Sequence, residues 1–460
     1  MNDMTPVVTA MGTKTTPVAA RKGLVLFALC LGVLIAQVDT SVVNLAMQPI
    51  GTALHASVSA LQWVLDAYNL TYAALLLTGG LVADLYGRRR AFQIGAAVLA
   101  AASIGCALAP SVDILIVARA VAGIGSALLL PASLAIVRVV WLEANARRRA
   151  LGVWASCNGL AFVIGPTLGG LFIKWFGWPS VFLLAVPLAI AALAMAAWVV
   201  PESSDRTERH FDLPGQVLGA IVLGGLVFAA IAGHASPDAS MVGLILSIVA
   251  LPIFLLHEHR AKAAALVPLE LFRKPAFCGA IVATASMTFG VYGMIFLLPL
   301  VWQSSGFLAP DGSGLALMPC ALVLFLVAPR SGHLAQRFGV RAMIAGGTAL
   351  IGCGLLVLAA THGGTPLVAV QIGLVLAGIG MGLNTGPLMS VAVDAVSAAR
   401  SGTASSLINV ARMAGATLGV AVLGTVFAMA HGGAEGLRAA MLVGGATQLC
   451  GAVVAARTIR

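Results

Sequence analysis

Long apolar runs, separated by short polar segments, make up most of this chain of 460 residues. A helix needs about 20 apolar residues to cross the core of a bilayer, which is roughly 30 Å thick. By that rule the pattern predicts fourteen membrane-spanning helices, of which 241–257 is the shortest. They lie near residues 23–46, 60–83, 91–110, 113–137, 150–172, 180–200, 214–233, 241–257, 276–301, 312–332, 341–360, 366–391, 403–429 and 438–456.

The composition supports a surface that faces lipid. Hydrophobic residues make up 60% of the chain and charged residues 9%, whereas a soluble domain carries roughly 25% charged residues. The net charge of +10 does not indicate a nucleic-acid-binding protein, because the basic residues form short clusters between apolar runs. We therefore expect an all-α integral membrane protein that contacts the lipid bilayer and no nucleic acid.

The basic residues also predict an orientation. If the N-terminus is cytoplasmic, all but four of the 26 lysines and arginines fall on the cytoplasmic side of the predicted spans. The exceptions are Lys174 and Arg438 on the outside, and Arg119 and Arg412 within spans. Such an excess of positive charge in cytoplasmic loops is typical of helical membrane proteins. We predict a multi-pass protein of the cell inner membrane with both termini in the cytoplasm.

An internal repeat divides the chain into two halves. A glycine, a polar residue and a second glycine occur at offsets 0, 4 and 7 in two turns, 80–87 and 332–339. Each turn joins the second and third span of a predicted six-helix half. Two unrelated glycine-rich turns are the weaker interpretation, because both spacing and position match. The predicted divisions are a cytoplasmic tail at 1–22, an N-terminal bundle at 23–200, a linker at 201–213, an inserted helix pair at 214–260, a linker at 261–275 and a C-terminal bundle at 276–456.

Four motifs resemble those of the major facilitator superfamily, and specifically of its fourteen-helix drug:proton antiporters. They are the segments 39–44, 80–90, 115–125 and 159–170, in the expected order and spans. The resemblance covers almost the whole chain and implies a major facilitator-type fold, with two six-helix bundles plus two inserted helices. It also implies export of lipophilic small molecules in exchange for protons, and we expect a monomer.

Two of these motifs have a mechanical interpretation as gating elements. Asp84, in the loop after the second span, is placed to pair with Arg88 or to cap a helix N-terminus. The glycines of 159–170 remove side-chain bulk and allow close approach to another helix, by analogy the tenth span. Arg412 fits a packing or gating charge better than a substrate ligand. The predicted gating residues are Gly80, Asp84, Gly87, Arg88, Arg89, Gly165, Pro166, Gly169, Gly170 and Arg412.

Three ionisable residues within the first half are candidates for chemistry, because charged side chains inside a span are costly. With a rise of about 1.5 Å per residue, Asp39, Asp66 and Arg119 all lie at a similar depth towards the outside. Burial favours the protonated form of a carboxyl group, whereas a nearby arginine favours the ionised form. We predict that Asp39 carries the coupling proton, tuned by Arg119, and that Asp66 attracts cationic substrate. Exchanged roles for the two aspartates and a static ion pair are the alternatives.

Other polar residues are candidates for the substrate path. Trp63 and Tyr68 fit aromatic residues of the membrane interface equally well. The predicted substrate-binding residues are Asp66, Asn44, Gln62, Trp63, Tyr68, Asn158, Asn384 and Asn409.

The sequence contains no phosphate-binding loop of the type that ATPases use, and no metal-ligand spacing or nucleophile triad. We therefore expect no enzyme, no metal and no cofactor. The predicted function is proton-coupled export of lipophilic, often cationic, compounds across the cytoplasmic membrane. The alternative is proton-coupled export of a particular metabolite or siderophore.

Overall fold

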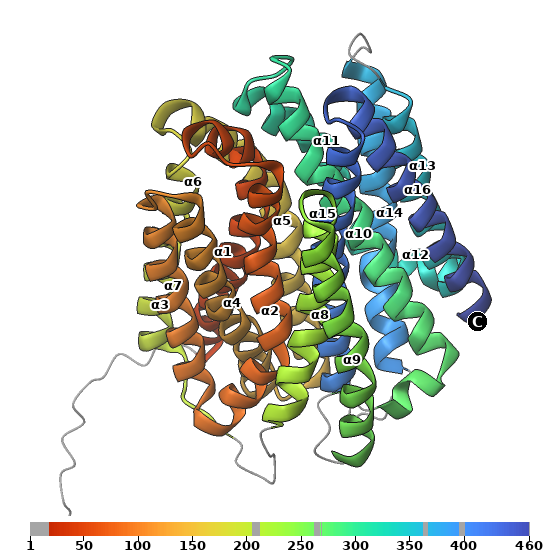
Figure 1. Cartoon of the computed structure of the whole chain (residues 1–460). Coiled ribbons are helices and arrows are strands. Elements are labelled where there is room, and N and C mark those ends of the chain that lie inside the picture. Colours follow the sequence, from red (N-terminus) through yellow and green to blue (C-terminus); the bar gives the residue numbers. More distant parts are fainter. Residues whose placement is uncertain are drawn as a thin grey trace, which may run out of the picture.

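The computed structural model describes residues 18–204, 212–261, 267, 269–361, 367–394 and 401–459 (Figure 1). Within these residues every regular element is a helix, and each apolar segment predicted from the sequence is helical. The α-helices are α1 (Val18–Ala53), α2 (Val58–Tyr86), α3 (Arg88–Ala107), α4 (Val112–Val140), α5 (Ala144–Phe176), α6 (Ser180–Leu183), α7 (Ala185–Val199), α8 (Leu213–Ala235), α9 (Pro237–Ala261), α10 (Pro275–Ser304), α11 (Pro310–Val327), α12 (Ser331–Phe338), α13 (Val340–Ala359), α14 (Leu367–Asp394), α15 (Ser401–Met429) and α16 (Gly433–Thr458). The short 3-10 helices are η2 (Leu269–Arg273) and η3 (Ala328–Arg330).

Two prolines explain where the structure departs from the predicted boundaries. The predicted span 180–200 is divided into α6 and α7, because Pro187 has no N–H to donate to the carbonyl four residues earlier. The predicted span 312–332 lies within one candidate membrane span, Pro310–Phe338, which consists of α11, η3 and α12 with Pro329 at the junction. Pro329 has no N–H to donate to the carbonyl of Phe325, so the regular α-helical hydrogen bonds are interrupted there and the chain continues as η3 and α12.

Twelve helices of the described chain are long and apolar enough to cross a membrane, which makes this a multi-pass membrane protein. The predicted spans in α2 and α5 are not among these twelve helices. The predicted number of fourteen spans is therefore not established. α2 is 29 residues long, but Asp66 and Asn69 lower its hydropathy. In α5 several side chains are not described. The remaining apolar segment, Val163–Phe176, is too short to be one of the twelve.

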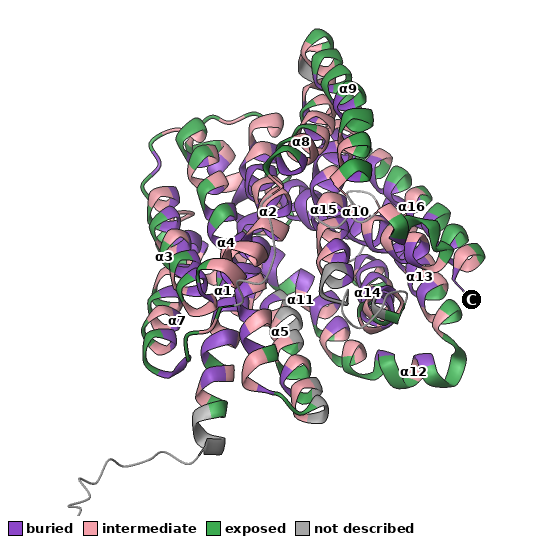
Figure 2. Cartoon of the chain, turned by 90° about the horizontal axis from the view of Figure 1, so that it is seen from below, coloured by how far each residue is buried: buried purple, intermediate pink, exposed green. Residues whose placement is uncertain are grey.

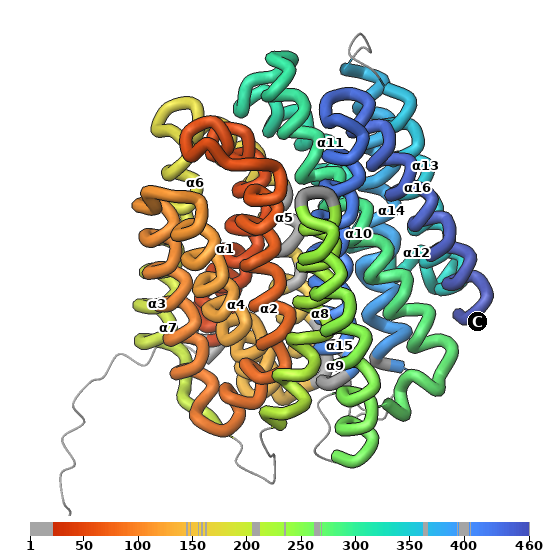
Figure 3. Tube along the Cα trace, viewed as in Figure 1, coloured from red at the N-terminus to blue at the C-terminus, as the bar shows by residue number. Residues whose placement is uncertain are grey.

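The helices form two groups that face each other (Figures 1 and 3). α1 to α7 pack mainly with one another, as do α10 to α16. The groups meet where α1 contacts α10, where α2 contacts α15 and where α5 contacts α11. The predicted divisions of the chain stay a prediction. Parts of the tail at 1–22 and of the linkers at 201–213 and 261–275 lie outside the described residues.

α8 and α9 form a pair beside the seam between the two groups. α8 packs against both α2 and α15, and α9 packs on α8 (Figure 1). Along α9 most residues are exposed, as Figure 2 shows from below. The exposed residues of α9 include Met241, Val242, Leu244, Ile245, Leu246, Ile248, Val249, Leu251, Ile253, Leu255 and Leu256. An apolar surface of this extent is stable against lipid and not against water.

The two repeated turns have the same backbone geometry. Gly87 lies between α2 and α3 with φ +117°, and Gly339 lies between α12 and α13 with φ +87°. Each glycine ends one helix and begins the next. Since residues with a Cβ rarely adopt such φ values, glycine is required at both positions.

Candidate functional site

A buried ion pair joins α1 to α4. Nη1 of Arg119 lies 2.5 Å from Oδ2 of Asp39, and both side chains are only 1% exposed. Nε of Arg119 donates to the carbonyl of Val64 at 3.1 Å, which ties α2 to the same group. The guanidinium also lies over the ring of Tyr68, 4.4 Å from its centroid. Arg119 is therefore held on three sides by charge, hydrogen bond and aromatic ring.

Tyr68 belongs to this site and not to the outer interface. It is 1% exposed, and its hydroxyl lies 2.8 Å from Oγ of Ser126 in α4. The same hydroxyl donates to the carbonyl of Ala36 in α1 at 3.2 Å. Tyr68 thus connects α1, α2 and α4 around the ion pair.

Asp66 is buried in a very different environment. Its side chain is fully buried, and neither carboxylate oxygen has a hydrogen-bond partner in the described structure. The structure therefore does not add Asp66 to the ion pair of Asp39 and Arg119. An ionised carboxylate in such a place is very unfavourable, because nothing replaces the water that it loses.

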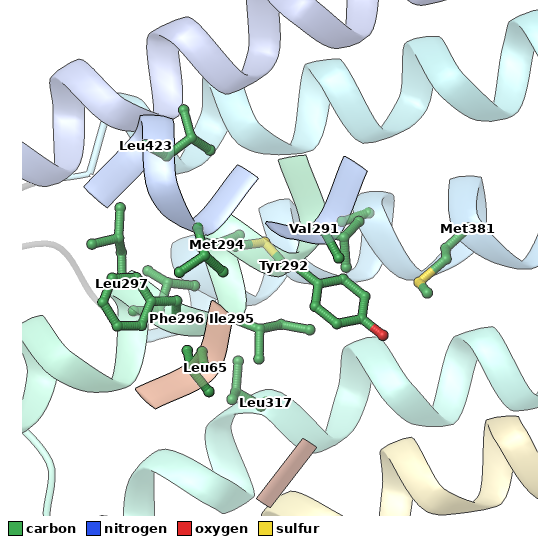
Figure 4. Close-up of a cluster of buried hydrophobic side chains, with 14 of the residues drawn as sticks. Leu65, Val291, Tyr292, Met294, Ile295, Phe296, Leu297, Leu317, Met381 and Leu423 are labelled. Atoms are coloured by element: carbon green, nitrogen blue, oxygen red, sulfur yellow. The ribbon is translucent and has the colours of Figure 1, made fainter. Parts of the chain in front are cut away.

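A cavity lies between the two groups of helices. Helices α1 and α5 supply part of its wall, and α10, α11 and α14 supply the rest. Figure 4 shows four of its lining residues on the second group, with the ring of Tyr292 beside them. The lining residues are Ser41, Pro166, Val291, Ile295, Leu317, Cys320, Ala321, Leu324 and Met381.

Sequence reasoning missed most of this lining. Only Pro166 was singled out, as a gating residue, because aliphatic residues in an apolar run look alike whether they face lipid, another helix or a cavity. No sequence signal distinguishes Leu317 from its lipid-facing neighbour Leu315, which is 55% exposed.

The predicted substrate-binding residues, where their side chains are described, lie elsewhere. The amide of Gln62 donates to the carbonyls of Val420 and Ala421 at 3.1 and 2.8 Å, and so joins α2 to α15. Trp63 packs on Phe228 of α8, with ring centroids 6.2 Å apart.

The predicted asparagines whose side chains are described, Asn44, Asn384 and Asn409, are also absent from the described lining of this cavity. The amide of Asn44 donates to the carbonyl of Thr40 at 3.0 Å. Asn384 is fully buried, with its amide 3.0 Å from the hydroxyl of Thr348. Asn409 is half-buried and has an interaction partner, and the side chain of Asn158 lies outside the described residues.

The glycine motif of α5 forms a tight seam with two helices. Gly165 and Gly169 pack against Ser41 and Val42 of α1, where any side chain would collide. Further out, Gly170 faces the backbone of Pro310 and Asp311 at the start of α11. Gly314 of α11 in turn rests on the carbonyl of Pro166. The seam brings the two groups of helices into backbone contact.

Polar contacts add to this closure at the same end of the molecule. Nζ of Lys174, near the end of α5, lies 2.6 Å from Oδ2 of Asp311 in the first turn of α11. The amide of Gln303 in α10 donates to the carbonyl of Leu45 in α1 at 3.1 Å. None of these three side chains was predicted from the sequence as a site residue.

The loop between α2 and α3 lies at the opposite end. Oδ1 of Asp84 accepts from Nη2 of Arg88 at 2.8 Å, as one of the two predicted arrangements requires. Glu202, which follows α7, was missed. Its carboxylate accepts from the backbone N–H groups of Arg89 and Arg90 at 3.1 and 3.3 Å. It therefore caps the N-terminus of α3, where negative charge is favourable.

Arg412 lies on α15 at the junction of the two groups. It is half-buried and lies within electrostatic range of Tyr72 in α2. It also lies within electrostatic range of Tyr292 in α10. Its Nε has no hydrogen-bond partner in the described structure.

Comparisons with known proteins agree with this architecture. A family model described as Major Facilitator Superfamily matches residues 29–420. The chain is 36% identical over 409 residues to the multidrug resistance protein Stp of Mycobacterium tuberculosis, which covers 88% of this chain and 76% of Stp. It is 30% identical over 440 residues to the methylenomycin A resistance protein of Streptomyces coelicolor, which covers 95% of this chain and 92% of that protein.

The same fold occurs in a solved structure. A POT family transporter, crystallised in complex with a thioalcohol-conjugated peptide, matches with a TM-score of 0.71 at 16% identity. The match covers 94% of this chain and 95% of that one, and at this identity it shows the fold alone. The family and the relatives identify a membrane transporter and not an enzyme, as the sequence predicted. This chain belongs to the Major Facilitator Superfamily.

Proposed function

We propose that this protein is a proton-coupled antiporter that exports lipophilic compounds, drugs among them, across the cytoplasmic membrane. The relatives named for multidrug and methylenomycin A resistance support drug export. The apolar lining of the cavity, as far as it is described, favours lipophilic cargo over a siderophore or a polar metabolite. Proton coupling rests on one observation, the contrast between the paired Asp39 and the unpaired Asp66.

This contrast assigns different tasks to the two carboxyl groups. Asp39 has a counter-charge, because Arg119 lies 2.5 Å from its carboxyl group. Asp66 has no such partner, and its protonated form is the one compatible with its surroundings. We therefore assign the coupling proton to Asp66, with Asp39 and Arg119 holding α1 and α4 together. The proton assignment follows the exchanged roles that the sequence had left open. The role of Asp39 and Arg119 follows the other alternative, a static ion pair.

Alternating access then links the proton to the cargo. Lys174 and Asp311 together with the glycine seam close one end of the molecule, which we propose is the outer end. In this conformation Asp66 holds a proton taken up from outside and releases it towards the cytoplasm. The cargo enters the cavity from the cytoplasmic side, and the halves tilt so that it leaves outside. One proton that moves inward down 100 mV releases about 2.3 kcal/mol for this work.

The loop after α2 contributes a latch to the cycle. Asp84 and Arg88 form an ion pair, and Glu202 caps α3, at the proposed cytoplasmic end. These contacts lie within the first group of helices, so we propose that they favour one conformer through a rearrangement of this loop during the cycle. Their contribution to the free-energy difference between the two conformers must stay at a few kcal/mol. A larger difference would leave the less stable conformer unpopulated.

We propose a topology of fourteen spans, in which α2 and α5 cross the membrane with the twelve more apolar helices. The distribution of lysine and arginine supports cytoplasmic termini and insertion in the inner membrane. The proposed units are two six-helix halves, with α8 and α9 as an inserted pair. A single chain contains both halves, so the transporter is proposed to act as a monomer in the lipid bilayer.

Transport in proteoliposomes tests the proposal. Purified protein is reconstituted, a pH difference is imposed, and accumulation of a fluorescent lipophilic dye is followed with and without a protonophore. We expect accumulation that follows the pH difference in the wild type. Asp66→Asn, which is permanently uncharged, should lose accumulation but keep exchange of dye across the membrane without a gradient. A wild type that ignores the pH difference would contradict proton coupling. An Asp66→Asn variant that still accumulates dye would contradict only the assignment of the proton.

A further inference from the structure

The lipid-facing stripe of α11 ends at an arginine. Leu315, Leu322 and Leu326 are exposed, and their spacing of seven and four residues places them on one face of the helix. Arg330 follows Leu326 by four residues, at the end of η3, and its Nη1 donates to the carbonyl of Leu326 at 2.6 Å. The guanidinium group therefore lies at the end of an apolar strip that faces the acyl chains of the bilayer.

Two more arginines lie along the short helix that follows. α12 has eight residues and is about 12 Å long, with Arg337 in its last turn and Arg341 in the first turn of α13. Figure 2 shows α12 at the edge of the second group, and Arg330, Arg337 and Arg341 are all exposed. The guanidinium group of Arg337 lies over the exposed ring of Phe338, 5.3 Å from its centroid. This segment thus presents positive charge and apolar surface side by side.

The corresponding turn of the first half offsets its positive charge internally. Asp84 pairs with Arg88 at 2.8 Å. Oε2 of Glu202 lies 3.8 Å from Nε of Arg89 and 3.8 Å from Nε of Arg90. Two carboxylates of the protein therefore serve the three arginines of that turn.

The turn of the second half has no such carboxylate within the described residues. Gln336 stands at the offset of the aspartate in the repeat, so a charged partner is replaced by a neutral one. Of the three acidic residues between 275 and 460, Asp311 and Glu435 lie at the opposite end, in the first turns of α11 and α16. Asp394 ends α14, on which α12 packs, but in the described part of the chain no ion pair joins it to the three arginines.

We propose that Arg330, Arg337 and Arg341 bind the phosphate group of an anionic phospholipid in the leaflet beside α12, which in the proposed topology is the cytoplasmic one. The planar guanidinium group suits phosphate, because its N–H donors match the phosphate oxygens in pairs. Basic clusters next to a membrane helix attract anionic headgroups. The apolar strip of α11 and the ring of Phe338 favour a lipid over a soluble phosphate. The lipid thus supplies to the second half the negative charge that two carboxylates supply to the first.

Lipid titration of the purified full-length protein tests the proposal. The protein is stripped of lipid in a neutral detergent and titrated with dioleoylphosphatidylglycerol, or with dioleoylphosphatidylcholine, which has the same chains and no net charge. Native mass spectrometry counts the lipids that remain bound. We expect the wild type to bind the first phosphatidylglycerol about a hundredfold more tightly, because each of the three arginines contributes about fivefold. Equal affinity for the two lipids would overturn the inference.

Glutamine variants show whether these arginines form the site. Arg337→Gln should weaken binding of phosphatidylglycerol about fivefold, and replacement of all three arginines should abolish the preference. Arg260→Gln is the matched control, because Arg260 is also exposed, in the last turn of the lipid-exposed helix α9. An equal loss in the control would mean that surface charge in general attracts the lipid, and would contradict a site at α12. If the triple variant does not fold, Arg337→Gln and Arg341→Gln, each changed at one exposed side chain, decide the question.

A competition experiment separates the lipid from its free headgroup. Glycerol 1-phosphate carries the phosphate without the acyl chains and is added in excess to the complex with phosphatidylglycerol. We expect the lipid to stay bound, since the apolar strip contributes to its affinity. Displacement of the lipid by glycerol 1-phosphate at equal concentration would show a site for phosphate alone, and would overturn the assignment to a lipid.

Discussion

Arg119 and Asp39 approach to 2.5 Å in a part of the molecule where both side chains are 1% exposed. Removing two charges from water is expensive, and their attraction repays this cost only with good geometry and further hydrogen bonds. Here Arg119 donates a further hydrogen bond to the carbonyl of Val64 and lies over the ring of Tyr68, whereas Oδ1 of Asp39 has no hydrogen-bond partner in the described structure. The pair is thus suited to hold α1, α2 and α4 in one arrangement while the halves move.

Asp39→Asn should therefore destabilise the protein strongly. The change leaves the guanidinium of Arg119 buried without a counter-charge, which costs about 3–5 kcal/mol. Thermal unfolding in detergent measures the effect as a lower melting temperature. The double variant Asp39→Asn, Arg119→Gln removes both charges and should recover part of the loss. A double variant less stable than Asp39→Asn would contradict this account.

Glu202→Ala should loosen the start of α3. The carboxylate of Glu202 caps the N–H groups of Arg89 and Arg90, and loss of such a cap costs about 1 kcal/mol. Hydrogen exchange at the first turn of α3 should become faster. The matched control is Glu143→Ala, because Glu143 precedes α5 without a capping hydrogen bond from its side chain. Equal effects of the two substitutions on their helices would show that the cap is unimportant.

The helices of this protein follow from its sequence because the apolar runs match the thickness of a bilayer. The same reasoning placed Asp39 and Arg119 at a similar depth in the membrane, and in the structure they form an ion pair. Depth alone does not give the direction in which a side chain points around its helix. Asp66 has a similar calculated depth and yet takes no part in the pair.

Contacts between distant segments were harder to predict. Glu202 meets Arg89 across 113 residues of sequence, and only the packing of α7 beside α3 brings them together. By analogy alone the α5 glycines were expected to face the tenth span. The structure places α11 against Gly170, but α1 against Gly165 and Gly169. The cavity lining was not predictable, since aliphatic residues carry no mark of the surface that they face.

The ion pair between Lys174 and Asp311 should have a small effect on stability and a larger one on the conformational equilibrium. The side chains are 55% and 21% exposed, so solvent screens the pair and its contribution stays below about 1 kcal/mol. Even so, the pair links the two halves, and its loss favours opening at this end. Lys174→Asp should slow export, and the exchanged variant Lys174→Asp, Asp311→Lys should restore it. High salt should reduce the difference between wild type and variant. If the exchanged variant is as slow as the single one, the pair does not act as a latch.

Gly170→Ala tests whether backbone contact between α5 and α11 is needed for transport. A Cβ at this position would collide with the backbone at Pro310 and Asp311, which no side-chain rotation relieves. We expect the seam to stay open, hydrogen exchange at the start of α11 to accelerate, and export against a gradient to be lost. Gly346→Ala in α13 is the control, because a Cβ there meets no atom within 4 Å. Since both substitutions replace glycine by alanine within a helix, their effects on helix propensity should be similar. Export by Gly170→Ala at the rate of the control would mean that the halves can close without this contact.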